Sequence, residues 1–201
     1  AGLRLGHLGR WAEAGEVHRA VAGDRARLLG PDHPDTLASR YEAAFALSRT
    51  GRAADALRAY KQVTAARIRV RGADHPDTLA ARQEMAYVLG RLGRHLDAHQ
   101  VYAAVLAARE RTMGPDHPDT LVSRREVAVG LGWLGRWAEA LTEYRRVAAA
   151  RERVLGAGHP DTLTSRDDEA HCLQQLGRGA EAAELHRRTA ALRGRRPAGG
   201  P

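Results

Sequence analysis

The sequence has 201 residues, of which 43% are hydrophobic but only 4% aromatic, and this composition favours closely packed helices over a β-sandwich or barrel. Its net charge of +8 comes from arginines interspersed with 24 acidic residues, a bias typical of GC-rich genomes, so a nucleic-acid partner is not expected. No apolar run approaches the roughly 20 residues that cross a bilayer, and the N-terminus lacks the charged-then-apolar order of a signal peptide, so no membrane partner is expected either.

A period of 42 residues organises the chain. The tetrapeptide HPDT, followed by leucine, begins at His33, His75, His117 and His159. Because residues 1–8 align with only the second half of a first helix and no methionine opens the chain, we expect a fragment of a longer protein. The period delimits one solenoid domain with a truncated helix pair at 1–32, repeats at 33–74, 75–116, 117–158 and 159–194, and a disordered tail at 195–201.

Each repeat is predicted to form an antiparallel pair of helices. Apolar residues recur at steps of four, three and three from Leu37 to Leu47, and a second apolar stripe begins at Ala53. Gly51 lies between the stripes, where glycine can end a helix in the left-handed conformation at little cost. The second helix is expected to continue to about Arg71.

The HPDT linkers are interpreted as helix punctuation. Asp74 is expected to be the N-cap of the following helix, and Pro76 suits its first turn, where the missing N–H has no helical partner. The repeated histidines could suggest a metal site, but a whole helix pair separates consecutive linkers, too far for two imidazoles to share an ion. His95 and His99 lie four residues apart but lack a third ligand, so neither a metal nor a cofactor is expected.

The sequence contains no catalytic constellation. Cys172 follows His171, but adjacent residues of a helix point about 100° apart, so they do not form a nucleophile and its base. There is no glycine-rich phosphate loop and no GxSxG motif. A single cysteine cannot form an internal disulfide, which favours a reducing, cytoplasmic setting for a protein that is not an enzyme.

Several recurring positions resemble the tetratricopeptide repeat. They are a small residue and a leucine in the first helix, a Gly-Arg turn, and an alanine followed four residues later by an aromatic, as in Ala44, Leu47, Gly51-Arg52, Ala56 and Tyr60. The 42-residue length and the DHPDTL linker are similar to the kinesin-light-chain-like subclass. The resemblance covers nearly the whole chain and implies an all-α fold, a right-handed α-solenoid of antiparallel helix hairpins.

Two arginine series recur with the same period and are interpreted as contacts between repeats. A residue repeated in every unit more often serves the repeat than a ligand, and the HPDT aspartates are possible partners for the guanidinium groups. The first-helix series is Arg40, Arg82, Arg124 and Arg166. The second-helix series is Arg25, Arg67, Arg109, Arg151 and Arg193.

Function is expected where the repeat varies. The resemblance implies that the first helices line a concave groove, and its inward positions are Tyr41, Phe45, Arg49, Gln83, Tyr87, Arg91, Arg125, Val129, Trp133, Asp167, His171 and Gln175. Aromatic rings beside arginines suit a protein or peptide with apolar and acidic side chains, bound to a scaffold module of a larger regulatory or signalling protein. The alternatives are that Tyr41 or Tyr87 packs within the array, that the terminal repeats self-associate into a homo-oligomer, or that the arginines bind nucleic acid.

Overall fold

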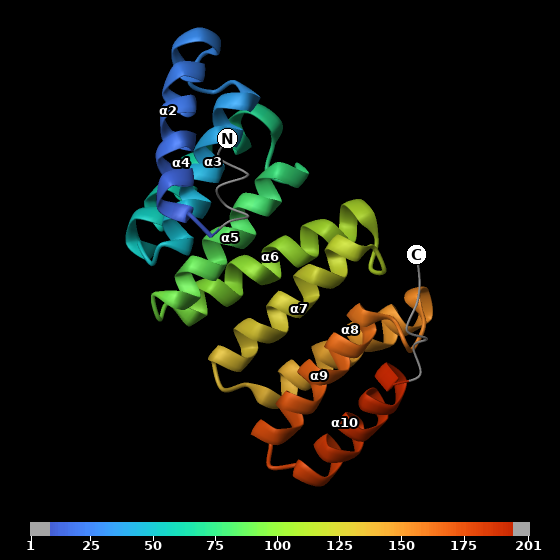
Figure 1. Ribbon diagram of the computed structural model, residues 1–201. Helices are drawn as coiled ribbons and strands as arrows, with labels where there is room; N and C mark the ends of the chain where they lie inside the picture. The colour runs from blue at the N-terminus through green and yellow to red at the C-terminus, as the bar shows by residue number, and fades with distance from the viewer. Residues whose placement is uncertain (1–8, 195–201) are drawn as a thin grey trace. The chain divides into compact units, whose positions relative to one another are not determined.

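In the computed structural model, residues 9–194 are described, and every regular element among them is an α-helix (Figure 1). The predicted all-α fold is therefore confirmed. The truncated helix expected at residues 1–8 and the disordered tail expected at 195–201 lie outside the described residues. The helices are α2 (Trp11–Leu29), α3 (Pro34–Arg49), α4 (Ala53–Arg71), α5 (Pro76–Arg91), α6 (His95–Met113), α7 (Pro118–Trp133), α8 (Trp137–Leu155), α9 (Pro160–Gln175) and α10 (Gly179–Gly194).

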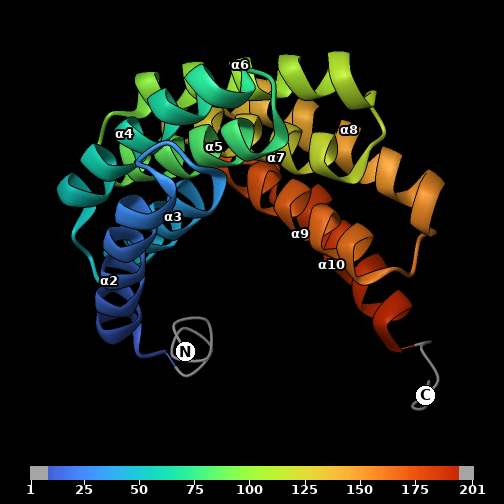
Figure 2. The same ribbon diagram turned by 90° about the horizontal axis from the view of Figure 1, so that it is seen from above.

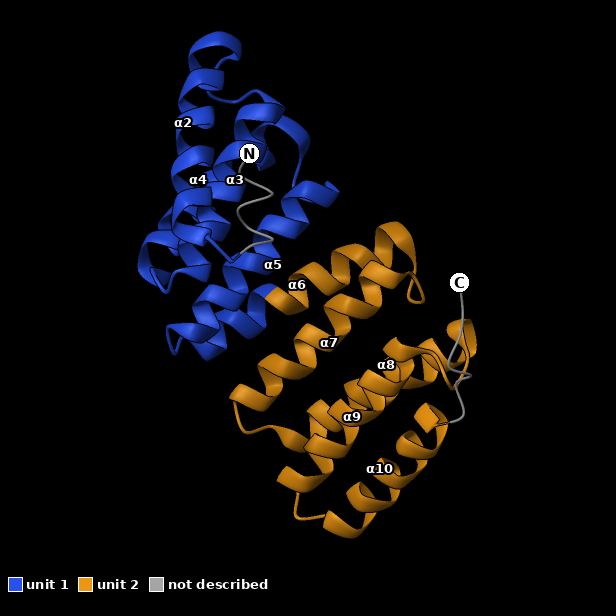
Figure 3. Cartoon of the chain, in the orientation of Figure 1, with its two compact units in different colours: residues 1–101 blue, residues 102–201 orange. Residues whose placement is uncertain are grey.

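The chain divides into two compact units, residues 1–101 (unit 1) and residues 102–201 (unit 2), which Figure 3 shows in blue and orange. In unit 1, α2 packs on α3, α3 on α4, and α4 on α5, and the first helices α3 and α5 also contact each other. In unit 2, α7, α8, α9 and α10 pack in the same consecutive manner (Figure 2). These helices thus pack against their neighbours in sequence, as a helical repeat requires.

Histidine is the N-cap of each of the first helices α3, α5, α7 and α9. Nδ1 of His75 accepts a hydrogen bond of 3.1 Å from the backbone N–H of Asp77, and His33, His117 and His159 form equivalent bonds. The expectation that Asp74 caps the helix is wrong. A residue before proline is restricted to extended backbone angles, here φ −62° and ψ 139° at His75, and these are the angles that an N-cap adopts. Pro76 occupies the first turn as expected.

Glycine and threonine complete the linkers of unit 1. Gly72 has φ +91°, a left-handed conformation that ends α4 after Arg71, and its carbonyl accepts a hydrogen bond of 2.9 Å from the Thr78 hydroxyl. Gly51 has φ +80° in the turn between α3 and α4, as the sequence indicates. Each residue of the HPDT motif near Gly72 therefore has a structural task, which ties the end of one helix pair to the start of the next.

Candidate peptide-binding surface

The second-helix arginines tie successive helix pairs together through backbone atoms. Arg109 donates from Nη1 to the carbonyl oxygen of Asp119 at 3.0 Å and to Oγ of Ser123 at 2.7 Å. Arg25 and Arg151 make the same two contacts with their own neighbours. The predicted role in contacts between repeats is confirmed for these arginines, but the acceptor is the aspartate backbone and not its carboxylate.

Arg67 departs from this pattern because Ala81 occupies the position of the serine. It keeps the bond to the Asp77 carbonyl oxygen, at 2.6 Å, and its guanidinium carbon lies 4.8 Å from the ring centroid of Tyr41. Burial lowers the pKa of Arg67, although the neighbouring Asp77 opposes that shift. A groove residue predicted from the sequence, Tyr41, thus replaces the serine as the partner of this arginine.

Tyr41 and Phe45 pack within unit 1. The Tyr41 ring meets the Tyr60 ring edge-on at 5.7 Å between centroids, and Phe45 meets Trp11 in the same way at 5.5 Å. Burial, assisted by nearby Glu84 and Glu42, raises the pKa of Tyr41 to about 12. Both aromatic side chains are half-buried, so most of the surface of each ring packs within the array.

The exposed groups of the unit 1 stripe are Arg49, Tyr87 and Arg91. Tyr87 retains 40% of its surface, more than is usual for a large aromatic side chain with only a packing role. Arg91 donates to the backbone carbonyl of Ser48 at 2.9 Å, which brings its guanidinium from α5 to the end of α3, next to Arg49. The guanidinium of Arg49 lies over the Trp11 ring at 5.3 Å. Gln83 is half-buried at the start of the same α5 stripe.

In unit 2 the charged groove positions already have partners. Arg125 donates two hydrogen bonds, of 2.5 and 3.0 Å, to the carboxylate of Asp168, and this contact raises the pKa of Arg125. Asp167 pairs with Arg193, and Nδ1 of His186 lies 3.7 Å from its other oxygen. An arginine expected to receive an acidic ligand is therefore neutralised by the chain itself.

The remaining groove positions of unit 2 form no matching surface. The Trp133 ring lies 6.3 Å from the Tyr102 ring, and His171 meets Trp137 edge-on at 6.1 Å. Val129 is half-buried, and Gln175 is exposed. The twelve predicted positions therefore differ in character between the two units, and only unit 1 combines an exposed aromatic with exposed arginines.

Sequence reasoning missed the glutamates around the first-helix arginines of unit 2. Arg124 pairs with Glu143 at 2.8 Å and also with Glu110. Arg166 pairs with Glu169 at 2.8 Å and with Glu152 at 2.5 Å. The signal was present in the sequence, because the equivalent positions around Arg40 are alanines, Ala26, Ala43 and Ala59, but spacing alone does not reveal which arginine the glutamates face.

Within residues 9–194, no group of three or more histidine, cysteine, aspartate or glutamate side chains is placed to hold a metal ion. None of the helices in this part of the chain is both long enough and apolar enough to cross a membrane. The single thiol, Cys172, is buried, and its Sγ donates to the backbone carbonyl of Trp137 at 3.1 Å. Burial raises the pKa of this thiol, which makes it a poor nucleophile.

Solved structures with similar repeats match nearly the whole chain. A putative kinesin light chain with nearly identical TPR-like repeats from Podosopora anserina is 28% identical, with a TM-score of 0.86 over 98% of this chain and 94% of that one. BtubC from P. vanneervenii is 16% identical, with a TM-score of 0.85 over 100% and 80%. PlcR of Bacillus thuringiensis, solved with the peptide PapR7 and DNA, is 12% identical, with a TM-score of 0.65 over 95% and 69%. No curated protein sequence matches the chain.

These likenesses agree with the helix pairs described above, and they assign the fold to the TPR-like α-solenoids, as the resemblance implied. The sequence profile of the tetratricopeptide repeat matches residues 2–69, 44–111 and 125–194, which together make up most of the chain. The chain belongs to the tetratricopeptide repeat family.

Proposed function

We propose that the chain is a peptide-binding module that uses the first-helix stripe of unit 1, on α3 and α5. Family and fold support a protein-interaction scaffold, and the observation that carries the finer proposal is the exposed Tyr87 ring on the same stripe as the exposed Arg91 guanidinium. The half-buried rings of Tyr41 and Phe45 form the packed base of this surface. Gln83 and Arg49 complete it.

The chemistry of the stripe indicates a ligand with apolar and acidic side chains. Arg49 and Arg91 contact a ring and a backbone carbonyl respectively, and among residues 9–194 neither is paired with a carboxylate. Exposed guanidinium groups of this kind attract acidic ligands and fix their register, while the Tyr87 ring offers apolar area to a neighbouring side chain. PlcR, whose structure includes a bound peptide, is an example of a similar fold that holds one.

The setting we propose is a larger cytoplasmic protein, of which this chain is one module. The buried thiol of Cys172 suits a reducing compartment. The tetratricopeptide fold is typical of non-catalytic scaffolds, and we propose no enzymatic role. That the first-helix stripe of unit 2 forms a second contact surface remains a prediction. In this stripe, Arg125 is already neutralised by Asp168.

Selection from a displayed library of random peptides tests the unit 1 surface. Peptides selected by the wild-type chain should be rich in acidic and apolar residues, and Tyr87→Ala with Arg91→Ala should weaken their binding about tenfold or more, as expected for an aromatic and an arginine at an interface. The matched control is Leu28→Ala with Arg27→Ala, an exposed apolar and arginine pair on α2. If the Tyr87 and Arg91 variant keeps its helical circular dichroism and binds within twofold of wild type, the proposed surface is wrong.

A further inference from the structure

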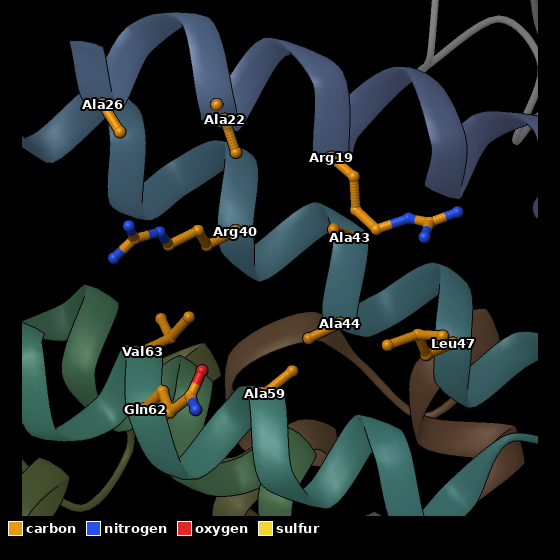
Figure 4. A pocket seen from close by; sticks show the side chains of 11 residues that line it. Arg19, Ala22, Ala26, Arg40, Ala43, Ala44, Leu47, Ala59, Gln62 and Val63 are labelled. Carbon is orange, nitrogen blue, oxygen red and sulfur yellow. The ribbon is translucent and has the colours of Figure 1, made fainter. Parts of the chain in front are cut away.

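A hollow of about 420 Å³ lies between the second helices α2 and α4, with α3 as its floor (Figure 4). Its walls are made by small side chains, among them Ala26 on α2, Ala43 on α3 and Ala59 on α4. Two arginines, Arg19 and Arg40, supply the charge at its edges. The hollow uses other α3 positions than the peptide surface proposed above, so it is a separate feature of unit 1.

Unit 2 shows what these positions bind when a carboxylate is available. Three repeats after Arg19, Arg40 and Ala43 the sequence has Arg145, Arg166 and Glu169. There, Nε of Arg145 and Nη1 of Arg166 donate to the two oxygens of Glu169, at 2.9 and 2.8 Å. Glu169 is 6% exposed, so the two arginines enclose the carboxylate that they bind.

The other carboxylates around this arginine follow the same rule. Arg124, two repeats after Arg40, pairs with Glu110 and with Glu143, at the positions of Ala26 and Ala59. Glu152, which pairs with Arg166, is three repeats after Ala26. The positions that carry these glutamates in unit 2 are therefore alanine around Arg40, and they line the hollow there.

Among the described residues, Arg19 and Arg40 have only backbone acceptors. Nη1 of Arg40 donates to the carbonyl oxygen of Pro31 at 3.2 Å, and Nε of Arg19 donates to that of Gly15 at 3.4 Å. Figure 4 shows their guanidinium groups pointing apart, with Ala43 and Ala44 between their stems. Across residues 9–194, no carboxylate is paired with either arginine. A bidentate guanidinium–carboxylate bond is stronger than these single backbone contacts, so a carboxylate that entered the hollow would draw both groups inward.

We infer that the hollow binds a glutamate side chain from a segment of a partner protein. Its carboxylate takes the place between Arg19 and Arg40 that Glu169 takes between Arg145 and Arg166. The alanine side chains that line the hollow cover the methylene groups of the glutamate and the small residues next to it. A free anion cannot make this apolar contact. Among the described residues of unit 2, every carboxylate that pairs with Arg124 or Arg166 belongs to a glutamate, so the length of this side chain fits the geometry.

The test follows the side-chain Nε–Hε signals of the arginines by NMR during titration with a capped Ala-Ala-Glu-Ala-Ala peptide. The Glu peptide should shift the signals of Arg19 and Arg40, and the matching Gln peptide should bind at least about tenfold more weakly, because it lacks the charge. Ala43→Glu should abolish the response, since the new carboxylate fills the site from within. Glu169→Ala should create a second response at Arg145 and Arg166.

Three results would overturn the inference. They are an equal response to the Gln peptide, a response that persists in a folded Ala43→Glu variant, and no response of Arg19 and Arg40 to the Glu peptide. Free glutarate that binds as tightly as the peptide would exclude a protein segment as the occupant, and a phosphoserine peptide that binds more tightly would exclude the carboxylate. Capture at Tyr87 and Arg91 does not involve Ala43, so failure here leaves the proposed function standing.

Discussion

Units 1 and 2 carry arginines at the same first-helix positions but surround them differently. In unit 2, Arg124 and Arg166 each hold two glutamates of the chain. In the described part of unit 1, Arg40 donates only to a backbone carbonyl, and it lines a hollow whose walls are largely alanine. The neighbouring residues therefore decide the role of a repeated arginine. Where they include glutamates, the arginine forms ion pairs within the array, and where they are alanines, it is available for a ligand.

The two units also differ in what fills the space beside the first helices. Unit 1 places the aromatic rings of Tyr41 and Tyr60 against each other and those of Phe45 and Trp11 against each other. Unit 2 has the ion pair Arg125–Asp168 at a position equivalent to Tyr41, although it keeps an edge-on ring contact, Trp137–His171, at the positions of Trp11 and Phe45. Ring contacts depend little on salt, whereas ion pairs that are partly exposed weaken as salt rises.

The largest expected effect comes from the aromatic side of this comparison. Tyr60→Ala should lower the free energy of unfolding by about 3–5 kcal/mol, because the ring is fully buried and its removal leaves a cavity. Tyr144→Ala, at the equivalent position of unit 2, should cost less, since Tyr144 is 8% exposed. Urea unfolding followed by circular dichroism measures both. Equal costs would show that the edge-on contact with Tyr41 adds nothing in unit 1.

A middle-sized effect is expected from the ion pairs. Glu169→Ala should destabilise the chain by about 1–2 kcal/mol, less than for a fully buried pair, because Arg145 is 47% exposed and can turn toward water. Glu169→Gln should lose less, since the amide oxygen still accepts a hydrogen bond. Glu181→Ala, which removes a surface pair with Arg178, is the control and should leave stability unchanged. A Glu169→Ala variant as stable as that control would contradict a structural role for the pair.

The smallest effect separates two threonines of the HPDT motif. The Thr78 hydroxyl donates to the Gly72 carbonyl at 2.9 Å, whereas the buried Thr162 hydroxyl has no hydrogen-bond partner among residues 9–194. Thr78→Val should therefore cost about 1 kcal/mol, and Thr162→Val should be neutral or slightly stabilising. Thermal unfolding of the two variants side by side checks the sign, and a similar loss in both would mean that the linkers of the two units are equivalent.

The helices could be predicted from the sequence because their signals are local. Gly51 and Gly72 mark helix ends in the left-handed conformation, and the end of α4 at Arg71 follows directly. The identity of the N-cap was missed because Asp74 is the more common capping residue type, while the restriction that Pro76 places on His75 decided the matter. A further signal was that Ala81 occupies the position that is Ser39 in the preceding repeat. Spacing alone does not show that this position contacts a second-helix arginine.

The candidate surfaces were less accessible to sequence reasoning because they depend on which side chains meet in space. The stripe from Tyr41 to Arg49 follows helical spacing, but the sequence does not show that Tyr60 and Trp11 cover its rings. Likewise, Ala43 and Glu169 align in the repeat, yet only the structure places Arg145 and Arg166 on that glutamate. Contacts between neighbouring helix pairs decide these matters, and no short motif encodes them.

The second-helix arginines have a consequence for how such arrays change in evolution. Arg25, Arg109 and Arg151 each donate to a backbone carbonyl ten residues further along the chain. A gene segment that encodes one repeat therefore also encodes the arginine contact that holds it to the next repeat, and this contact is kept when the segment is duplicated or deleted by unequal recombination. Arrays can therefore lengthen or shorten by whole repeats without compensating substitutions. Single codon changes, such as the one that distinguishes Ala43 from Glu169, give each repeat its own chemistry.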